Sequence, residues 1–185
     1  MTPSDIPTPE RAAEAHPPHA LPTSPEALMA RLDGLGIRYE THRHEPVFTV
    51  EEAKRLRGTL PGAHIKNLFL RNKKGRMWLA VIDEDRKVDL GDLANRLGAG
   101  RFSFGSPDRL MAHLGVLPGA VTPLALINDR QHLVEPVLDR AILGNGPVNC
   151  HPLTNDMTLA LDPGDLLRFI EACGHHPQIL DFDAG

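Results

Sequence analysis

The stretch His64-Ile-Lys-Asn-Leu-Phe-Leu-Arg-Asn72 has the composition of a buried apolar strand with one cation, Lys66, near its start. A basic run that contains a glycine follows at residues 71–76, and a second apolar run, Met77-Trp-Leu-Ala-Val-Ile82, comes directly after it. Polar residues and glycine between two apolar runs are typical of a turn, so the pattern predicts a β-hairpin. The open end of this hairpin would carry Lys66 and Asn67.

Five helices are predicted around the hairpin, because at five places a capping residue precedes an apolar repeat of three or four residues. The predicted starts are Ser24-Pro25, Thr49, Asp89, Ser106-Pro107 and Asp162-Pro163. The start at Thr49-Val-Glu-Glu52 is a capping-box pattern, in which the first and fourth side chains bond each other's backbone. Glycines at or near positions 34–36, 58, 98–100, 115 and 174 are expected to end these helices.

Further strands are predicted where short apolar runs alternate with polar residues or end at turns. These strands are residues 37–41, a second hairpin formed by 124–127 and 132–135 with its turn at Asn128-Asp129, residues 157–161 and residues 179–182. Strands joined by short hairpins, with helices between them, favour an α+β fold over a doubly wound parallel sheet. We therefore predict a mixed, largely antiparallel sheet surrounded by helices.

The two ends of the chain differ in composition. Seven prolines fall within the first 25 residues, which carry almost no large apolar side chains and cannot repay the entropy cost of folding. The whole chain has 185 residues, 41% of them hydrophobic, which suffices for one buried core. The prediction is a flexible tail at residues 1–23 and a single domain at residues 24–185.

The charge balance limits the classes of partner. With 20 Lys and Arg against 24 Asp and Glu, the formal net charge is -4, so extended non-specific binding of nucleic acid, DNA included, is not expected. Local basic patches at residues 54–57 and 71–76 could still contact a polyanion. The chain has two cysteines without a CxxC pair and no apolar run near the roughly 20 residues of a membrane span. These features predict a soluble cytoplasmic protein without membrane contact.

Common catalytic motifs are missing from the sequence: it has no phosphate loop, GxGxxG turn, HExxH helix or GxSxG elbow. The close histidine pairs, at 42 and 44 and at 175 and 176, have no acidic partner at a convincing spacing, so neither a metal nor another cofactor is predicted. Cys150 and His151 are adjacent and should point to opposite sides of an extended segment, which disfavours a thiol nucleophile. Three segments remain as candidates: Lys66-Asn67, the loop 115–123 and the run 149–156.

In their order and spacing, these three segments resemble the YbaK/ProX family of aminoacyl-tRNA editing domains, from about Ser24 to Phe182. The run His151-Pro-Leu-Thr-Asn-Asp156 is most similar to the free-standing alanyl-tRNA(Pro) deacylases. The resemblance implies the fold of that family and a hydrolase that removes alanine from mischarged Ala-tRNA(Pro), with Cys-tRNA(Pro) as the alternative substrate. The implied partners are aminoacyl-tRNA, contacted at its 3′ end and acceptor stem, and prolyl-tRNA synthetase.

The resemblance also implies roles for particular residues. In the family, the lysine at the position of Lys66 is the characteristic functional residue, and a glycine-x-x-x-proline loop lines the substrate pocket. The implied catalytic residue is therefore Lys66, and the implied substrate-binding residues are Asn67, Gly119, Ala120, Val121, Thr122, Pro123 and His151.

Elementary chemistry is compatible with these roles. Backbone N–H groups of such a loop can stabilise the oxyanion that forms when water attacks an ester. The charge of Lys66 would act on the terminal phosphate or on that oxyanion, while Asn67 and His151 would orient the acyl-adenosine by hydrogen bonds. Whether a side chain or the ribose hydroxyl of the substrate activates the water stays open at this level.

The expected substrate follows from size. A synthetase pocket built for proline cannot strongly exclude alanine, because a missing methylene changes binding by only about 1–3 kcal/mol, so a second and smaller site corrects the error. Small residues such as Ala120 and Val121 suit a tight acyl pocket. Two other classes remain as alternatives: a non-catalytic nucleic-acid-binding module and a metal-dependent hydrolase.

Overall fold

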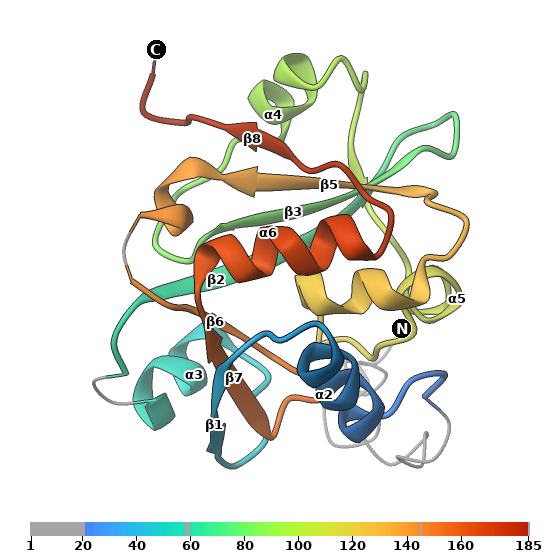
Figure 1. Cartoon of the computed structure of the whole chain (residues 1–185). Coiled ribbons are helices and arrows are strands. Elements are labelled where there is room, and N and C mark those ends of the chain that lie inside the picture. The colour runs from blue at the N-terminus through green and yellow to red at the C-terminus, as the bar shows by residue number, and fades with distance from the viewer. Residues whose placement is uncertain (1–20, 58–59, 145, 185) are drawn as a thin grey trace, which may run out of the picture.

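The computed structural model describes residues 21–57, 60–144 and 146–184 (Figure 1). Its α-helices are α2 (Pro25–Gly34), α3 (Val50–Arg57), α4 (Leu90–Arg96), α5 (Pro107–Leu114) and α6 (Pro163–Ala172), and its 3-10 helices are η2 (Pro123–Asn128) and η3 (Arg140–Leu143). Its strands are β1 (Tyr39–Arg43), β2 (Ala63–Arg71), β3 (Met77–Asp83), β4 (Ser103–Phe104), β5 (Val134–Asp139), β6 (Val148–Cys150), β7 (Met157–Leu161) and β8 (Gln178–Leu180).

The strands form one mixed sheet in the order β1-β7-β6-β2-β3-β5-β8, with β4 paired to the end of β2. Four of the pairings are antiparallel, β1 with β7, β7 with β6, β2 with β3 and β2 with β4. The pairings of β2 with β6, β3 with β5 and β5 with β8 are parallel. The predicted α+β class with a mixed sheet is confirmed.

The hairpin predicted at residues 64–82 is also confirmed. Strands β2 and β3 pair antiparallel from Ile65 opposite Asp83 to Arg71 opposite Met77. The buried side chain of Asn72 shapes the turn, because its Oδ1 accepts hydrogen bonds from the backbone N–H groups of Lys74 and Arg76, both at 3.0 Å. Its Nδ2 donates to the carbonyl oxygen of Ala99 at 2.9 Å, so every polar group of this side chain is used.

The second hairpin, predicted at residues 124–135, is wrong. Residues 123–128 form η2, because Pro123 occupies a first helical position and the Thr122 hydroxyl caps it by accepting from Leu124 N–H at 3.3 Å. The strand that follows, β5, pairs with β3 and β8 in parallel instead of folding back on its neighbour. A short apolar run such as 124–127 suits a buried helical turn as well as a strand, so its periodicity could not decide.

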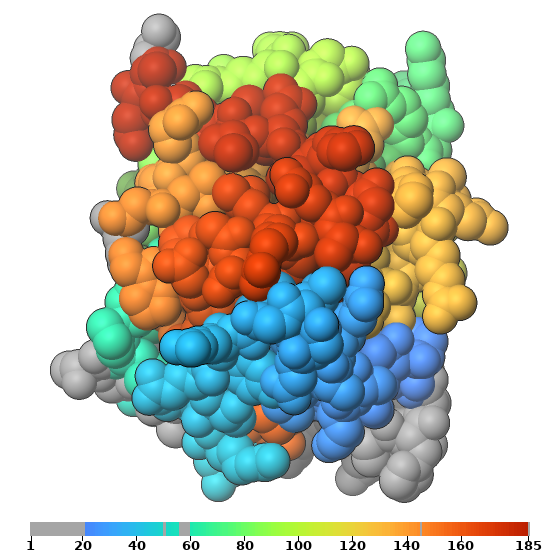
Figure 2. Space-filling view, viewed as in Figure 1, coloured from blue at the N-terminus to red at the C-terminus, as the bar shows by residue number. Residues whose placement is uncertain are grey.

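Two hydrophobic cores cover the two faces of the sheet. On one face, Ile65 and Phe69 of β2 pack with residues of α2, α5, α6 and η2. Figure 2 shows α2 in blue and α6 in orange-red covering this side of the molecule. On the other face, Leu68 and Leu70 pack with Trp78 and with residues of α4. The alternation along β2 therefore decides which side chains can reach which face.

The predicted helix starts are confirmed within the described residues. The Thr49 box is complete, because Glu52 N–H donates to the Thr49 hydroxyl at 3.1 Å and Thr49 N–H donates to Glu52 Oε2 at 3.3 Å. The helix end predicted near position 58 and most of the tail predicted at residues 1–23 lie outside the described residues. At the first described positions, the Thr23 hydroxyl donates to Asn128 Oδ1 at 2.6 Å.

Candidate active site

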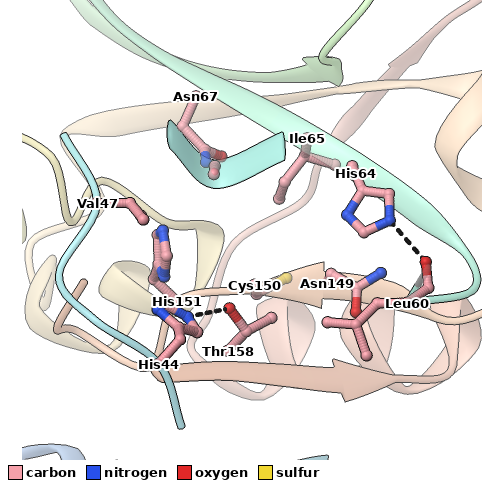
Figure 3. A pocket seen from close by; sticks show the side chains of 11 residues that line it. His44, Val47, Leu60, His64, Ile65, Asn67, Asn149, Cys150, His151 and Thr158 are labelled. Carbon is pink, nitrogen blue, oxygen red and sulfur yellow. Dashed lines mark hydrogen bonds between the residues drawn. The ribbon is translucent and has the colours of Figure 1, made fainter. Parts of the chain in front are cut away.

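A small cavity of about 80 Å³ lies between the start of β2, strands β6 and β7, and the chain from residue 44 to α3 (Figure 3). The residues that line it are His44, Val47, Ala53, Leu60, His64, Ile65, Asn67, Asn149, Cys150, His151 and Thr158. None of these lining residues is Asp, Glu, Lys or Arg. The cavity is therefore a neutral site whose polar groups are imidazoles, carboxamides and one hydroxyl.

His151 presents an unprotonated ring nitrogen at this site. Its Nδ1 lies 2.8 Å from the carbonyl oxygen of Met157, which can only accept, so Nδ1 carries the proton. Burial lowers the pKa of His151, the nearby His44 lowers it further, and the Met157 bond and Asp156 oppose this only in part. The ring is therefore neutral at physiological pH and keeps Nε2 as an acceptor.

His44 lies beside His151, with 6.0 Å between the ring centroids. Its Nδ1 lies 2.8 Å from the carbonyl oxygen of Glu45, and its Nε2 lies 2.8 Å from the hydroxyl of Thr158. In the neutral ring, Nδ1 donates to Glu45 and Nε2 accepts from Thr158. Both nitrogens of His44 are thus occupied, and the ring acts as a fixed wall against His151.

Two asparagines of the cavity have an unpartnered oxygen. Asn67 Nδ2 donates to the Val121 carbonyl at 3.0 Å, and Asn149 Nδ2 donates to the carbonyls of Pro61 and Ala63, both at 3.1 Å. These bonds fix each carboxamide with its nitrogen toward the backbone. The Oδ1 atoms of Asn67 and Asn149 are buried and have no hydrogen-bond partner in the described part of the chain. An unpaired buried acceptor costs about 1–3 kcal/mol, which a ligand that donates to it would recover.

The predicted glycine loop adjoins the cavity but does not line it. The Val121 carbonyl holds Asn67, while Thr122 and Pro123 are buried and begin η2. Gly119 has a positive φ of 90°, a conformation that suits glycine. Ala120 N–H already donates to the Leu117 carbonyl at 3.0 Å and Thr122 is fully buried, so the candidate oxyanion donors of the loop are the backbone N–H groups of Gly119 and Val121.

Lys66 points to the other face of the sheet. It lies opposite Ile82 in the hairpin, and the next residues of β2 on that face, Leu68 and Leu70, belong to the core under α4. Its ammonium donates to the carbonyl oxygen of Arg86. The structure thus brings Asn67 and His151 together at the cavity but not Lys66, whose predicted contact with substrate stays a prediction.

Comparison with known proteins fits this arrangement. Residues 44–169 match the model of the aminoacyl-tRNA editing domain. The chain belongs to this family. It is 43% identical over 154 residues to the prolyl-tRNA synthetase associated domain-containing protein 1 of Danio rerio, covering 82% of this chain and 84% of the relative. It is 39% identical over 151 residues to the prolyl-tRNA editing protein ProX of Acetoanaerobium sticklandii, covering 81% and 92%.

Solved structures share the fold of this editing domain. A putative trans-editing enzyme for prolyl tRNA synthetase superposes with a TM-score of 0.65 at 21% identity, over 97% of this chain and 100% of that one. Within residues 21–57, 60–144 and 146–184, no helix is long and apolar enough to cross a membrane. No three His, Cys, Asp or Glu residues of these ranges are grouped to hold a metal ion.

Cys150 lines the cavity together with His151, but its burial disfavours a nucleophilic thiol. Burial raises the pKa of Cys150 to about 12, so the thiol stays protonated at neutral pH. Since the thiolate is the reactive form, nucleophilic attack by Cys150 is disfavoured. The sequence disfavours the thiol for another reason, the opposite orientations expected of Cys150 and His151, but both residues line the cavity.

Several lining residues were not predicted from the sequence as site residues. His44 was considered only as a metal ligand, and Asn149 was noted only as part of the run 149–156. His64 begins the hairpin stretch, but no neighbouring residue in the sequence indicates that its side chain lines a cavity. A local signal existed for Asn149 alone, because a polar residue two positions before His151 on an extended strand shares its face.

Proposed function

We propose that this editing domain is a trans-editing deacylase that hydrolyses the ester of mischarged Ala-tRNA(Pro). The proposal is carried by one observation, the small neutral cavity that holds the unprotonated Nε2 of His151 and two unpaired carboxamide oxygens. Its volume of about 80 Å³ is that of roughly two or three water molecules, which suits a small acyl group. The names of the relatives, a prolyl-tRNA editing protein among them, support a substrate of this class.

The chemistry requires only water and a polarised ester. Water adds to the ester carbonyl carbon, the oxyanion collapses, and the bond to the ribose oxygen breaks while that oxygen takes up a proton. The products are alanine and tRNA(Pro) with a free ribose hydroxyl. The backbone N–H groups of Gly119 and Val121 are the proposed donors to the oxyanion, and His151 Nε2 accepts a hydrogen bond from the substrate or the attacking water.

Lys66 is proposed to act on the phosphate of the terminal nucleotide rather than on the ester. Its ammonium is bound to a neutral carbonyl, that of Arg86, and forms no ion pair within the described residues. The charge is therefore not neutralised by a carboxylate. Because the side chain leaves the strand next to Asn67 but on the opposite face, it suits a group of the RNA outside the cavity better than the acyl carbon.

The size of the cavity is also proposed to exclude the correctly charged Pro-tRNA(Pro) from hydrolysis. Prolyl esters carry a ring that alanyl esters lack, and the cavity of about 80 Å³ is walled by the apolar side chains of Val47, Ile65 and Leu60. Inserting extra methylenes into a packed site typically costs about 1–3 kcal/mol. Such a penalty corresponds to roughly a 5- to 150-fold preference for the alanyl ester.

The test is to incubate the purified protein with alanyl-, cysteinyl- and prolyl-tRNA(Pro) and to follow loss of the labelled amino acid. We expect fast hydrolysis of the alanyl ester and little hydrolysis of the prolyl ester, while the cysteinyl ester reports how narrow the selection is. Lys66→Ala should lower kcat/KM for alanyl-tRNA(Pro) roughly 10- to 150-fold, which corresponds to the loss of one charge-assisted hydrogen bond. The same variant should change kcat/KM for alanyl-adenosine by less than about twofold, because this substrate has no phosphate.

Survival of all three esters would contradict the deacylase proposal. Equal loss of activity on alanyl-tRNA and alanyl-adenosine in the Lys66 variant would instead place that lysine at the reacting ester. Lys73→Ala, an exposed lysine in the hairpin turn, is the matched control for a change in net charge.

A further inference from the structure

The editing cavity offers acceptors to a ligand, while most of its side-chain donors already bond protein acceptors. His64 Nε2 bonds the Leu60 carbonyl at 2.9 Å, and the donors of His44, Thr158 and both asparagines also bond protein acceptors. Among the described residues, no hydrogen-bond partner is found for the Oδ1 of Asn67, the Oδ1 of Asn149 or the Nε2 of His151. A neutral cavity with several free acceptors is complementary to a small group that carries several N–H or O–H donors.

Asn149 is the most buried of these polar residues, with only 7% of its surface exposed. Its orientation is fixed, because Nδ2 donates to two backbone carbonyls and leaves no alternative assignment of nitrogen and oxygen. It stands on β6 directly opposite His64 of β2, at the end of the cavity formed with Leu60. The oxygen is therefore a rigid acceptor that bulk water does not compete for.

A purely structural role does not account for this oxygen. Holding residues 61–63 against β6 requires only the two N–H donors of Asn149, and these bonds leave the oxygen of the same carboxamide buried without a partner among the described residues. Asn72 shows the contrast, because it is equally buried and uses both its oxygen and its nitrogen within the turn of the hairpin. Buried polar groups are normally paired, so an unpaired one at a cavity indicates a ligand.

We propose that Asn149 is a substrate-binding residue whose Oδ1 accepts a hydrogen bond from the α-ammonium group of the aminoacyl ester. This inference rests on the proposed deacylase function and adds the group of the substrate that the site recognises. The α-ammonium carries three N–H donors on the carbon next to the ester carbonyl, so acceptors around it would position the carbonyl for attack. The site would then discriminate aminoacyl esters from esters without a free amino group.

The experiment compares three substrates with the full chain. They are alanyl-tRNA(Pro), propionyl-tRNA(Pro), in which hydrogen replaces the ammonium group, and alanyl-tRNA(Pro) ending in 2′-deoxyadenosine. Each is assayed with the wild type, with Asn149→Leu and Asn149→Ser, and with the control Asn72→Leu. The serine variant keeps one hydroxyl donor for a backbone carbonyl of residue 61 or 63. The ratio of kcat/KM between substrates is read within one preparation, so the folded fraction cancels.

Asn149→Leu and Asn149→Ser are expected to lower kcat/KM for both alanyl esters about tenfold or more and for the propionyl ester less than about twofold. Asn72→Leu should change all three by the same factor. Equal losses of kcat/KM on the alanyl and propionyl esters in the Asn149 variants would overturn the inference. A loss that disappears only with the 2′-deoxy ester would also overturn it, because the Asn149 oxygen would then bind the ribose hydroxyl. If the wild type hydrolyses none of the esters, the proposed function itself fails.

Discussion

Replacing His151 with alanine is expected to lower kcat/KM for alanyl-tRNA(Pro) roughly 10- to 150-fold, because the site loses an acceptor for a charged or reacting group. The acceptor exists only in the neutral ring, whose Nδ1 is held by Met157. His176→Ala is the matched control, since His176 is exposed and does not line the cavity, and it should stay within about twofold of the wild type.

The pH dependence of wild-type activity should also report the neutral form of His151. Because burial and His44 lower the pKa of His151, the ring is neutral above that lowered value and becomes protonated only as the pH falls through it. Activity should therefore be constant across neutral pH and decline only below the ordinary histidine value of about 6.5. A decline that begins above 6.5, or one that persists unchanged in the His151 variant, would contradict this role.

The largest effect on stability is expected for Asp129→Ala, at about 3–5 kcal/mol in the free energy of unfolding. Asp129 is buried and accepts hydrogen bonds from His175 Nε2 at 2.9 Å, from Val134 N–H at 2.8 Å and from Leu133 N–H at 3.1 Å. Removing its carboxylate leaves the equally buried His175 and two backbone donors without a partner. Urea unfolding at pH 7 measures the effect.

The control is Glu135→Ala, because Glu135 pairs with Arg76 at 2.7 Å while both side chains are about half exposed. Such a surface pair contributes roughly 0.2–1 kcal/mol. If Asp129→Ala were no more destabilising than Glu135→Ala, the buried network would not stabilise the fold.

Acid should reproduce part of the Asp129 effect. Burial alone would raise the pKa of Asp129, but the hydrogen bonds from His175, Val134 and Leu133 outweigh it and hold the pKa below its usual range. A carboxyl whose pKa is lowered by folding contributes stability that is complete above its unfolded value and is lost as the pH falls through the folded one. The Asp129 variant should show a weaker loss of stability in that acidic window than the wild type.

The parts of the fold that the sequence predicts are those with a local chemical cause. Caps such as Thr49 with Glu52 and the apolar runs on both sides of the Asn72 turn act within a few residues, so their patterns are visible in the chain. The run 124–127 follows a local helix signal, the Thr122 cap with Pro123 at the first helical position, but an apolar run of this length also suits a strand. Its conformation depends on packing under α5 and α6, which no local pattern contains.

The cavity was predictable only in part for the same reason. Asn67 and His151 were identified through the family resemblance, and the structure places both at the cavity. His44 and Asn149 belong to segments more than 100 residues apart, and only the pairing of β1 with β7 and of β2 with β6 brings them to one site. The free oxygen of Asn149 depends on where two backbone carbonyls lie, which a residue type cannot reveal.

The most direct measurement of the central claim is a crystal structure of the full chain with a 3′-alanylamido analogue of adenosine, whose amide resists hydrolysis. We expect the alanyl group to occupy the cavity, within hydrogen-bond distance of Asn67 Oδ1 and His151 Nε2, with the adenosine outside it. An alanyl group bound elsewhere on the molecule, with this cavity empty, would contradict the account.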